Sequence, residues 1–243
     1  MIGLDKLSHA FKAAATMPGM SRDPGFSVIC GYNDVAKLNK YLLPSIAKQE
    51  NCASEIILLD NREGKYTSAP PALNEAARAA RFDYLLFAHQ DISLISPLWL
   101  ANARKWLGKL VDLGAAGAAG RDEGGTVASV MHGEPPSLAG RPTSLPHEVQ
   151  TLDGCLLIVP AAAFAARGFD THIQLGWYLY VLDYCLDLIA AGLKSYVLPE
   201  WTYHLSTGPR TSTAYARSIN LIRKKHSAVG TIYSTVGVWS TKH

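Results

Sequence analysis

Several common functional signatures are missing from this sequence of 243 residues. None of its four cysteines forms a CxxC pair, which excludes zinc-finger and thioredoxin-type sites. No GxGxxG turn and no GxxxxGK[ST] loop occurs, which argues against dinucleotide oxidoreductases and P-loop enzymes. Residues 204–208 carry His204 where the GxSxG motif of serine hydrolases has its first glycine, so that class is disfavoured as well.

Strong charge and long apolar runs are also lacking. The net charge of +3 is too small to indicate a nucleic-acid-binding protein. The longest apolar stretch, residues 154–166, contains Pro160 and is shorter than the roughly 20 residues of a membrane helix. No signal peptide is visible, and scattered thiols suit a reducing compartment. We therefore expect a cytoplasmic protein, with attachment to the inner face of the membrane as an alternative.

What the sequence does contain is a regular alternation of strand-like and helix-like segments. Strands are predicted at residues 26–30, 55–60, 84–88 and 195–198, and helices at residues 71–81, 96–113, 177–190 and 212–226. Apolar strands that alternate with helices are typical of a mostly parallel sheet covered on both faces. We predict a single Rossmann-type α/β domain over residues 26–210, a helical extension over residues 1–25, and a C-terminal helix and tail over residues 211–243.

Polar side chains follow three of the predicted strands, at the edge where ligands bind in parallel sheets. They form the groups Tyr32-Asn33, Asp60-Asn61 and His89-Gln90-Asp91. A Gly/Pro-rich segment, residues 121–147, is too long for an ordinary connection and is expected to serve the site.

Three residues, two aspartates and a histidine, suit the transfer of a sugar from a nucleotide diphosphate. That reaction needs a cation for the departing diphosphate, a nucleotide site, and a base for the acceptor hydroxyl. Asp91 ends a strand, Asp183 lies on a predicted helix, and His204 follows the last strand. Carboxylate and imidazole ligands suit manganese, and carboxylates also suit magnesium.

Five stretches, in the same order along the chain, resemble the pattern of glycosyltransferase family 2. They are residues 28–33, 55–61, 74–76 with 84–91, 167–170, and 182–186 with 191–192. Residues 87–91 are most similar to a bacterial subgroup of glycosyltransferase-like proteins. The resemblance implies a GT-A fold, a UDP-, GDP- or dTDP-linked sugar donor, and a glycan or glycolipid acceptor in bacterial surface glycan synthesis.

The resemblance also implies roles on the donor side. Nucleotide-binding residues would be Tyr32, Asn33, Asp60 and Asn61. Asp91 and His204 would hold Mn²⁺ or Mg²⁺.

Further roles concern the transfer itself. The resemblance implies that Asp183 is the catalytic base of an inverting enzyme. Arg210, in a loop with Gly208, has the charge to bind the diphosphate. Asp153 and Trp177 are expected at the acceptor site, where the tryptophan can stack on a sugar.

Two positions depart from the family pattern. His89 stands where the DxD motif has its first aspartate, and Leu182 precedes Asp183 where a glutamate is usual. These departures keep open a non-catalytic nucleotide-sugar-binding or scaffold protein on the same fold. A nucleotidyltransferase is a further alternative, although the loop of residues 31–34 lacks the glycine-rich, basic character that such enzymes need.

Overall fold

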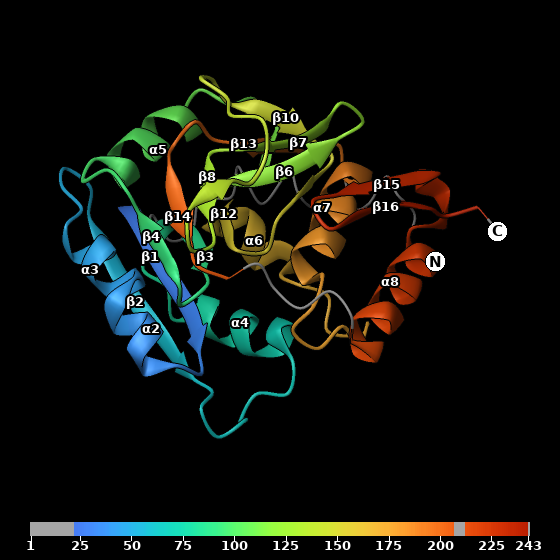
Figure 1. The fold of residues 1–243 in the computed structure, drawn as a ribbon, viewed down its shortest axis with the longest axis horizontal. Helices are drawn as coiled ribbons and strands as arrows, with labels where there is room; N and C mark the ends of the chain where they lie inside the picture. Colours follow the sequence, from blue (N-terminus) through green and yellow to red (C-terminus); the bar gives the residue numbers. More distant parts are fainter. Residues whose placement is uncertain (1–21, 207–211, 243) are drawn as a thin grey trace.

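The computed structural model describes residues 22–206 and 212–242 (Figure 1). Its helices are α2 (Val35–Lys40), α3 (Leu42–Ala47), α4 (Ala69–Arg78), α5 (Trp99–Leu107), α6 (Ala161–Arg167), α7 (Tyr180–Ala190) and α8 (Thr213–Lys225), with the short 3-10 helix η1 (Ser227–Val229). The strands of the main sheet are β1 (Asp23–Tyr32), β2 (Ser54–Asp60), β3 (Phe82–Ala88), β5 (Leu113–Gly117), β10 (His147–Val149), β12 (Leu156–Pro160) and β13 (Lys194–Val197).

The main sheet has seven strands in the order β10-β13-β5-β12-β3-β1-β2. β1 pairs in parallel with β2 and β3, and β13 pairs in parallel with β5. β12 is antiparallel to both of its neighbours and β10 is antiparallel to β13. Five of the seven strands therefore run in one direction, which confirms the mostly parallel sheet that the sequence predicts.

Both faces of this sheet are buried, because its central strands carry apolar side chains on each side. On one face Ile29 and Phe87 pack with α4, α6 and α7. On the other face Val28 and Leu86 pack with α2, α3 and α5. Successive residues of a strand point to opposite faces, so a continuous apolar run is what a sheet between two helical layers requires.

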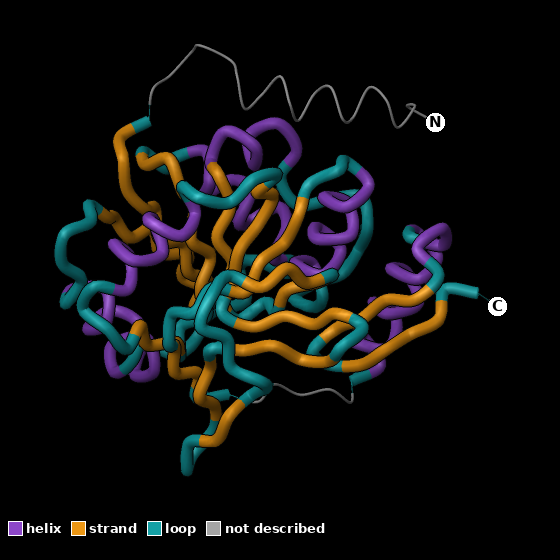
Figure 2. Tube along the Cα trace, turned by 90° about the horizontal axis from the view of Figure 1, so that it is seen from above, coloured by secondary structure: helices purple, strands orange, loops and turns teal. Residues whose placement is uncertain are grey.

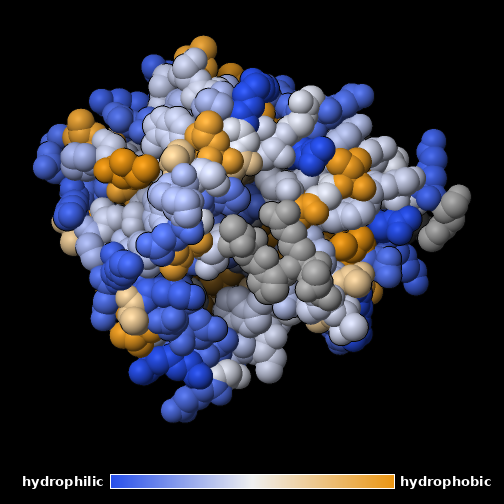
Figure 3. Space-filling model, in the orientation of Figure 1, coloured by the Kyte–Doolittle hydropathy of each residue, from blue (hydrophilic) through white to orange (hydrophobic). Residues whose placement is uncertain are grey.

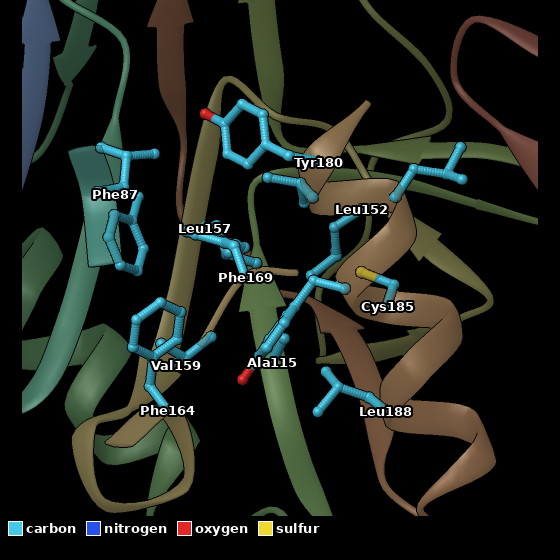
Figure 4. Packing of buried hydrophobic residues seen from close by; sticks show 14 of the residues in the cluster. Phe87, Ala115, Leu152, Leu157, Val159, Phe164, Phe169, Tyr180, Cys185 and Leu188 are labelled. Carbon is cyan, nitrogen blue, oxygen red and sulfur yellow. The ribbon is translucent and has the colours of Figure 1, made fainter. Parts of the chain in front are cut away.

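Aromatic rings dominate the first of these cores. The ring of Phe169 lies 5.0 to 5.3 Å from the rings of Phe87, Phe164, Tyr180 and Tyr184, measured between centroids. Figure 4 shows this cluster beside helix α7, which carries Cys185 and Leu188. Each such aromatic pair contributes about 1 kcal/mol beyond the burial of its surface. The cluster therefore holds α6 and α7 against β3.

The side chain of Asn74, in one of the stretches that resemble the family, has a structural role here. Its Nδ2 donates to the carbonyl of Phe169 over 2.8 Å, and its Oδ1 accepts from the Phe169 amide over 2.9 Å. Gly168, with φ of +66°, provides the left-handed turn between α6 and Phe169. Asn74 thus fixes the chain where it enters the aromatic core.

The sequence prediction of one helix over residues 96–113 is wrong at its C-terminal end. Helix α5 stops at Leu107, Gly108 is its C-cap, and residues from Leu113 onward form β5. The sequence of β5 is LGAAG, whose small residues have weak strand propensity. A Cβ on Gly114 would lie 2.9 Å from Leu193 and one on Gly117 2.8 Å from the Leu156 carbonyl oxygen. Close packing, rather than propensity, therefore selects the residues of this strand.

The Gly/Pro-rich segment of residues 121–147 forms several small strands. It lies in a three-stranded sheet of β11 (Thr151–Leu152), β6 (Ala119–Asp122) and β7 (Gly125–Ala128), and in a four-stranded sheet of β4 (Ile92–Leu94), β14 (Thr202–His204), β8 (Val130–His132) and β9 (Ser137–Leu138). A C-terminal hairpin of β15 (Thr231–Ser234) and β16 (Gly237–Ser240) packs beside the first of these sheets (Figure 2).

A membrane span requires a helix of sufficient length and hydropathy. Among the residues that the structure describes, no helix is both long and apolar enough to cross a bilayer. On the face drawn in Figure 3, hydrophobic residues form small patches separated by hydrophilic ones. The predicted extension over residues 1–25 lies mostly outside the described residues, and the division into three segments remains a prediction.

Candidate functional site

A cavity of about 400 Å³ opens at the edge of the sheet where β1, β2 and β3 end. These strands are parallel, so the residues that follow them meet at one edge. Tyr32 ends β1 and Asn33 follows it, Asn61 follows β2, and residues 89–91 follow β3. All of them line the cavity. The structure therefore brings together the polar groups that the sequence places after these strands.

His204 reaches this cavity through a strand pairing that no sequence pattern indicates. β14 is antiparallel to β4, with His204 opposite Ile92. The amide of Leu205 donates to the carbonyl of Asp91 over 3.1 Å. Asp91 and His204, 113 positions apart, are consequently adjacent.

Three side chains in this corner could ligate one metal ion. One ligand atom each from His89, Asp91 and His204 lies within 4.8 Å of the other two. His89 Nδ1 is 3.4 Å from His204 Nε2, which in turn is 3.5 Å from Asp91 Oδ1. Metal–nitrogen bonds are about 2.1 Å long, so both imidazoles can reach the same ion.

The environment of Asp91 keeps its carboxylate charged. Burial raises the pKa of Asp91, but hydrogen bonds from His204 and from Ser206 outweigh that effect and hold the pKa well below its usual range. Both the amide and the hydroxyl of Ser206 donate to Oδ2, which leaves Oδ1 directed toward His204. The loss of water around the ring and the neighbouring His204 lower the pKa of His89, which favours the neutral, ligating imidazole.

Gln90 joins the loop that follows β1 to the corner of His89, Asp91 and His204. Its Oε1 accepts from the amides of Asn33 and Asp34 over 2.9 and 2.8 Å. Its Nε2 donates to Oδ1 of Asn33 over 2.8 Å. The sequence reasoning assigned no role to Gln90, because the middle residue of such a motif carries no chemical signal of its own.

Asp60 is placed differently from its neighbour Asn61. Arg62 binds its carboxylate with distances of 2.6 to 3.0 Å, and the pair is solvent-exposed. Hydrogen bonds from the Arg62 side chain and amide hold the pKa of Asp60 well below its usual range. Asp60 is not among the residues that line the cavity, whereas Asn61 is. Its predicted nucleotide contact remains a prediction.

Trp177 forms one wall of the cavity. Its Nε1 donates to the carbonyl of Tyr66 over 3.1 Å. Its ring covers the backbone of Gly31, where a Cβ would lie 2.9 Å from the ring. A residue larger than glycine at position 31 would displace the tryptophan, which explains the glycine at the end of β1.

A second cavity, of about 260 Å³, lies on the other side of this wall. His89, Trp177, Tyr180 and His204 line both cavities. Asp153 and the tip of the β15–β16 hairpin line the second one alone. Leu179, also in its lining, has a left-handed φ of +56°, a strained backbone conformation for a residue that is not glycine.

Asp183 lies away from both cavities, in a cluster of charged residues between α7 and α8. It is 1% exposed and lines neither cavity. Lys225 Nζ is 2.8 Å from its Oδ2, and His226 Nε2 is 2.7 Å from its Oδ1. The same ammonium lies 2.8 Å from Asp170 and 2.9 Å from Asp187. The lysine therefore occupies the centre of this carboxylate group, where a metal ion would otherwise fit.

Solved structures share this arrangement of strands and helices. A mannosyltransferase from Pyrobaculum calidifontis, in complex with GDP-Man and Mn²⁺, matches 93% of this chain and 75% of its own, with a TM-score of 0.58 and 16% identity. The chain has the GT-A fold. S. aureus TarS residues 1–349, in complex with UDP-GlcNAc, match 83% of this chain and 66% of that one, with a TM-score of 0.55 and 15% identity.

A third GT-A structure, GalNAc-T7 with UDP, GalNAc and Mn²⁺, matches 87% of this chain with a TM-score of 0.56 and 11% identity. The chain spans about half of that protein and 39% of a longer TarS structure. No family model and no curated protein sequence matches this chain. At these identities the similarity establishes the GT-A fold alone.

The two residues predicted at the acceptor site both line the second cavity. Trp177 lies between the two cavities, and Asp153 borders the second. Arg210 lies outside the described residues. Sequence reasoning missed Ser206 and Tyr180, and the position of Ser206 two residues after His204 was the available signal for the first of them.

Proposed function

We propose that this protein is a metal-dependent glycosyltransferase that uses a nucleotide-sugar donor. The observation that carries the proposal is the convergence of His89, Asp91 and His204 at the cavity where β1–β3 end, on a GT-A fold. The similar mannosyltransferase and GalNAc-T7 structures contain Mn²⁺ with nucleotide sugars or their parts.

The donor set fits a divalent transition ion. One carboxylate and two imidazoles form a mixed oxygen and nitrogen set, which suits Mn²⁺ better than the all-oxygen preference of Mg²⁺. An ion held by these residues would neutralise negative charge on a departing diphosphate. His89 therefore takes the place of a carboxylate ligand and makes the site less negative.

The remaining donor-side residues would bind and orient the nucleotide. Asn33 offers its side-chain amide nitrogen at the cavity, and Tyr32 offers an aromatic ring. Asn61 lines the cavity with a side-chain amide that is hydrogen-bonded to the Tyr66 backbone. The Gln90 clamp keeps the loop of Asn33 in register with Asp91. We assign Arg210 to the diphosphate on its charge. A cytoplasmic location, an inverting reaction and an acceptor from a bacterial surface glycan complete the proposal.

Binding of nucleotide sugars to the purified protein tests this function. We expect that UDP-, GDP- or dTDP-sugars raise the melting temperature in the presence of Mn²⁺ and much less with EDTA. The variant Asp91→Asn should lose the metal-dependent part of that rise. The exposed Asp112, in the turn between α5 and β5, offers Asp112→Asn as a matched control.

The substitution of His89 for a carboxylate also supports a second candidate, a nucleotide-sugar-binding protein without transferase activity. Donor binding without release of nucleoside diphosphate, to any sugar or to water, would favour that candidate. Absence of any nucleotide binding, with or without Mn²⁺, would contradict both functions.

A further inference from the structure

The second cavity contains a carboxylate that is not needed to hold a metal ion or the nucleotide. Among the described residues that line the two cavities, Asp91 and Asp153 carry carboxylates. Asp91 belongs to the metal-ligating corner, whereas Asp153 lies in the cavity beyond the wall of His89 and His204. Asp153 thus borders a cavity that shares His89 and His204 with the metal corner and contains none of the predicted nucleotide-binding residues.

Asp153 is rigidly held, with capacity for one more partner on each oxygen. Its amide donates to the Ala119 carbonyl over 2.9 Å at the end of β11. Its Oδ1 accepts from the Cys155 amide over 2.9 Å, and its Oδ2 accepts from the Thr235 hydroxyl over 2.6 Å. Each carboxylate oxygen can accept two hydrogen bonds. Each therefore retains an acceptor site for a substrate hydroxyl.

The charge of Asp153 is not neutralised by an ion pair. Its carboxylate oxygens accept from a neutral backbone amide and a neutral hydroxyl, and among the described residues Asp153 makes no ion pair. Asp183 is in the opposite situation, since Lys225 and His226 engage both of its oxygens. A substrate hydroxyl could reach Asp183 only after the α7–α8 charge cluster came apart.

We propose that Asp153 is the general base of the transfer and that the second cavity holds the attacking part of the acceptor. This inference rests on the proposed glycosyltransferase function. The acceptor hydroxyl gives its proton to Asp153 as its oxygen forms a bond to the anomeric carbon. The bond from that carbon to the diphosphate oxygen breaks, and the nucleoside diphosphate leaves with the electron pair. Asp153 then returns the proton to water.

The lining of the second cavity indicates the class of acceptor. Trp177 and Tyr178 offer aromatic faces, which pack against the C–H faces of sugar rings. Ser234 and Thr235 offer hydroxyls from the hairpin tip. Of the described residues in this lining, none is lysine or arginine, so apart from His89 and His204 in the shared wall no basic side chain is there to pair with an anionic group. The acceptor is therefore a neutral glycoside rather than a phosphorylated or acidic sugar.

The variant Asp153→Asn tests this role with little structural change. An asparagine can still accept from the Cys155 amide, and its amide can donate to the Thr235 hydroxyl. We would measure release of nucleoside diphosphate from UDP-GlcNAc and GDP-mannose with Mn²⁺, using methyl glucoside, galactoside and mannoside as acceptor probes. Calorimetry with UDP and GDP measures nucleotide affinity separately. Asp112→Asn serves as the matched control.

We expect the release rate of the Asp153→Asn protein to fall by about 100-fold or more, the usual contribution of a general base. Its nucleotide dissociation constant should stay within about threefold of the wild type, since only the transition state is affected. Methyl 6-phosphoglucoside should be a poorer acceptor than methyl glucoside.

Three results would overturn the assignment of Asp153. They are a release rate close to wild type, a loss of nucleotide affinity that accounts for the whole rate change, or a wild-type protein that binds nucleotide without any release. A wild-type protein that binds neither UDP nor GDP would instead contradict the proposed function, which separates the two failures.

Discussion

Lys225 lies 2.8 Å from Asp183 and links the C-terminal helix α8 to α7 in the body of the fold. The Asp183 side chain is 2% exposed and the Lys225 side chain 24%. Because the same ammonium also meets Asp170 and Asp187, its removal leaves three carboxylates close together without their shared cation. Arg167, 2.8 Å from Asp187, compensates for part of that charge.

Replacing Lys225 by methionine should strongly destabilise the protein. Removal of one partner from a buried ion pair costs about 3–5 kcal/mol, because the remaining charge stays desolvated. Urea unfolding at neutral pH would measure the change. Lys224→Met is the matched control, since Lys224 is exposed and the residue next to it makes the contacts. Equal stability of the two variants would show that the charge cluster does not hold α8.

The same cluster should make stability depend on pH at both extremes. Burial raises the pKa of Asp170, but Lys225 and the His172 amide outweigh it and lower the pKa. That contribution is complete above about pH 4, the unfolded pKa, and is lost as pH falls through the lower folded pKa. Burial lowers the pKa of Lys225, yet Asp183 and its neighbours raise it overall. That contribution is complete below about pH 10 and is lost as pH rises through the raised folded pKa.

Unfolding midpoints of wild type and Lys225→Met, compared from pH 2 to 12, test this dependence. The difference in unfolding free energy between the two proteins should be constant between about pH 5 and 9 and should shrink toward both ends. A difference that does not vary with pH would mean that packing of the lysine chain, and not its charge, stabilises the helix.

The His204→Ala variant should bind Mn²⁺ at least about tenfold more weakly, since even second-shell changes at metal sites have effects of that size. Its Nε2 lies 3.5 Å from Asp91 Oδ1, so one of three candidate ligands is lost. Electron paramagnetic resonance of free Mn²⁺ measures the affinity directly. His172→Ala, at an exposed position outside the cluster, is the control. Unchanged affinity in His204→Ala would remove this histidine from the metal site.

The substitution Gly31→Val should weaken nucleotide binding by displacing Trp177. A Cβ at position 31 would lie 2.9 and 3.1 Å from two atoms of the indole ring, closer than ordinary contacts. We expect a change in tryptophan fluorescence and a loss of nucleotide affinity of about tenfold, equivalent to 1.4 kcal/mol. Gly108→Ala is the control, because its Cβ would meet its nearest neighbour at 3.5 Å. Unchanged fluorescence would show that the ring adjusts without leaving the cavity wall.

The Gln90→Leu variant should bind nucleotide more weakly without losing metal affinity. It removes three hydrogen bonds to the loop of Asn33 and Asp34, while His89 and Asp91 stay in place. Hydrogen bonds of this kind contribute about 1 kcal/mol each, so we expect a loss in nucleotide affinity between roughly fivefold, for one bond, and roughly 150-fold, for all three. Calorimetry with Mn²⁺ alone and with UDP or GDP separates the two effects. Equal losses of metal and nucleotide affinity would indicate a general disturbance of the corner.

The strands that form the candidate site could be predicted from the amino-acid sequence. β1, β2 and β3 were predicted from short apolar runs, and the polar residues after them meet in one cavity. Local signals suffice for this, because apolar periodicity identifies each element and parallel strands end at a common edge. The strand β5 was missed, since its glycines and alanines are selected by contacts with Leu193 and Leu156 from distant parts of the chain.

The candidate site also shows which features the sequence determines and which depend on the tertiary structure. Asp91 and His204 were candidates because carboxylates and imidazoles are groups that ligate metals, whereas Asp153 was expected at the acceptor site and Asp183 as the base. Which residues contact these side chains was decided by the tertiary structure. The β4–β14 pairing brings His204 to Asp91, the C-terminal hairpin brings Thr235 to Asp153, and Lys225 takes the carboxylate of Asp183. Such partners lie 42 to 113 residues apart, and long-range contacts between them leave no periodic trace in the sequence.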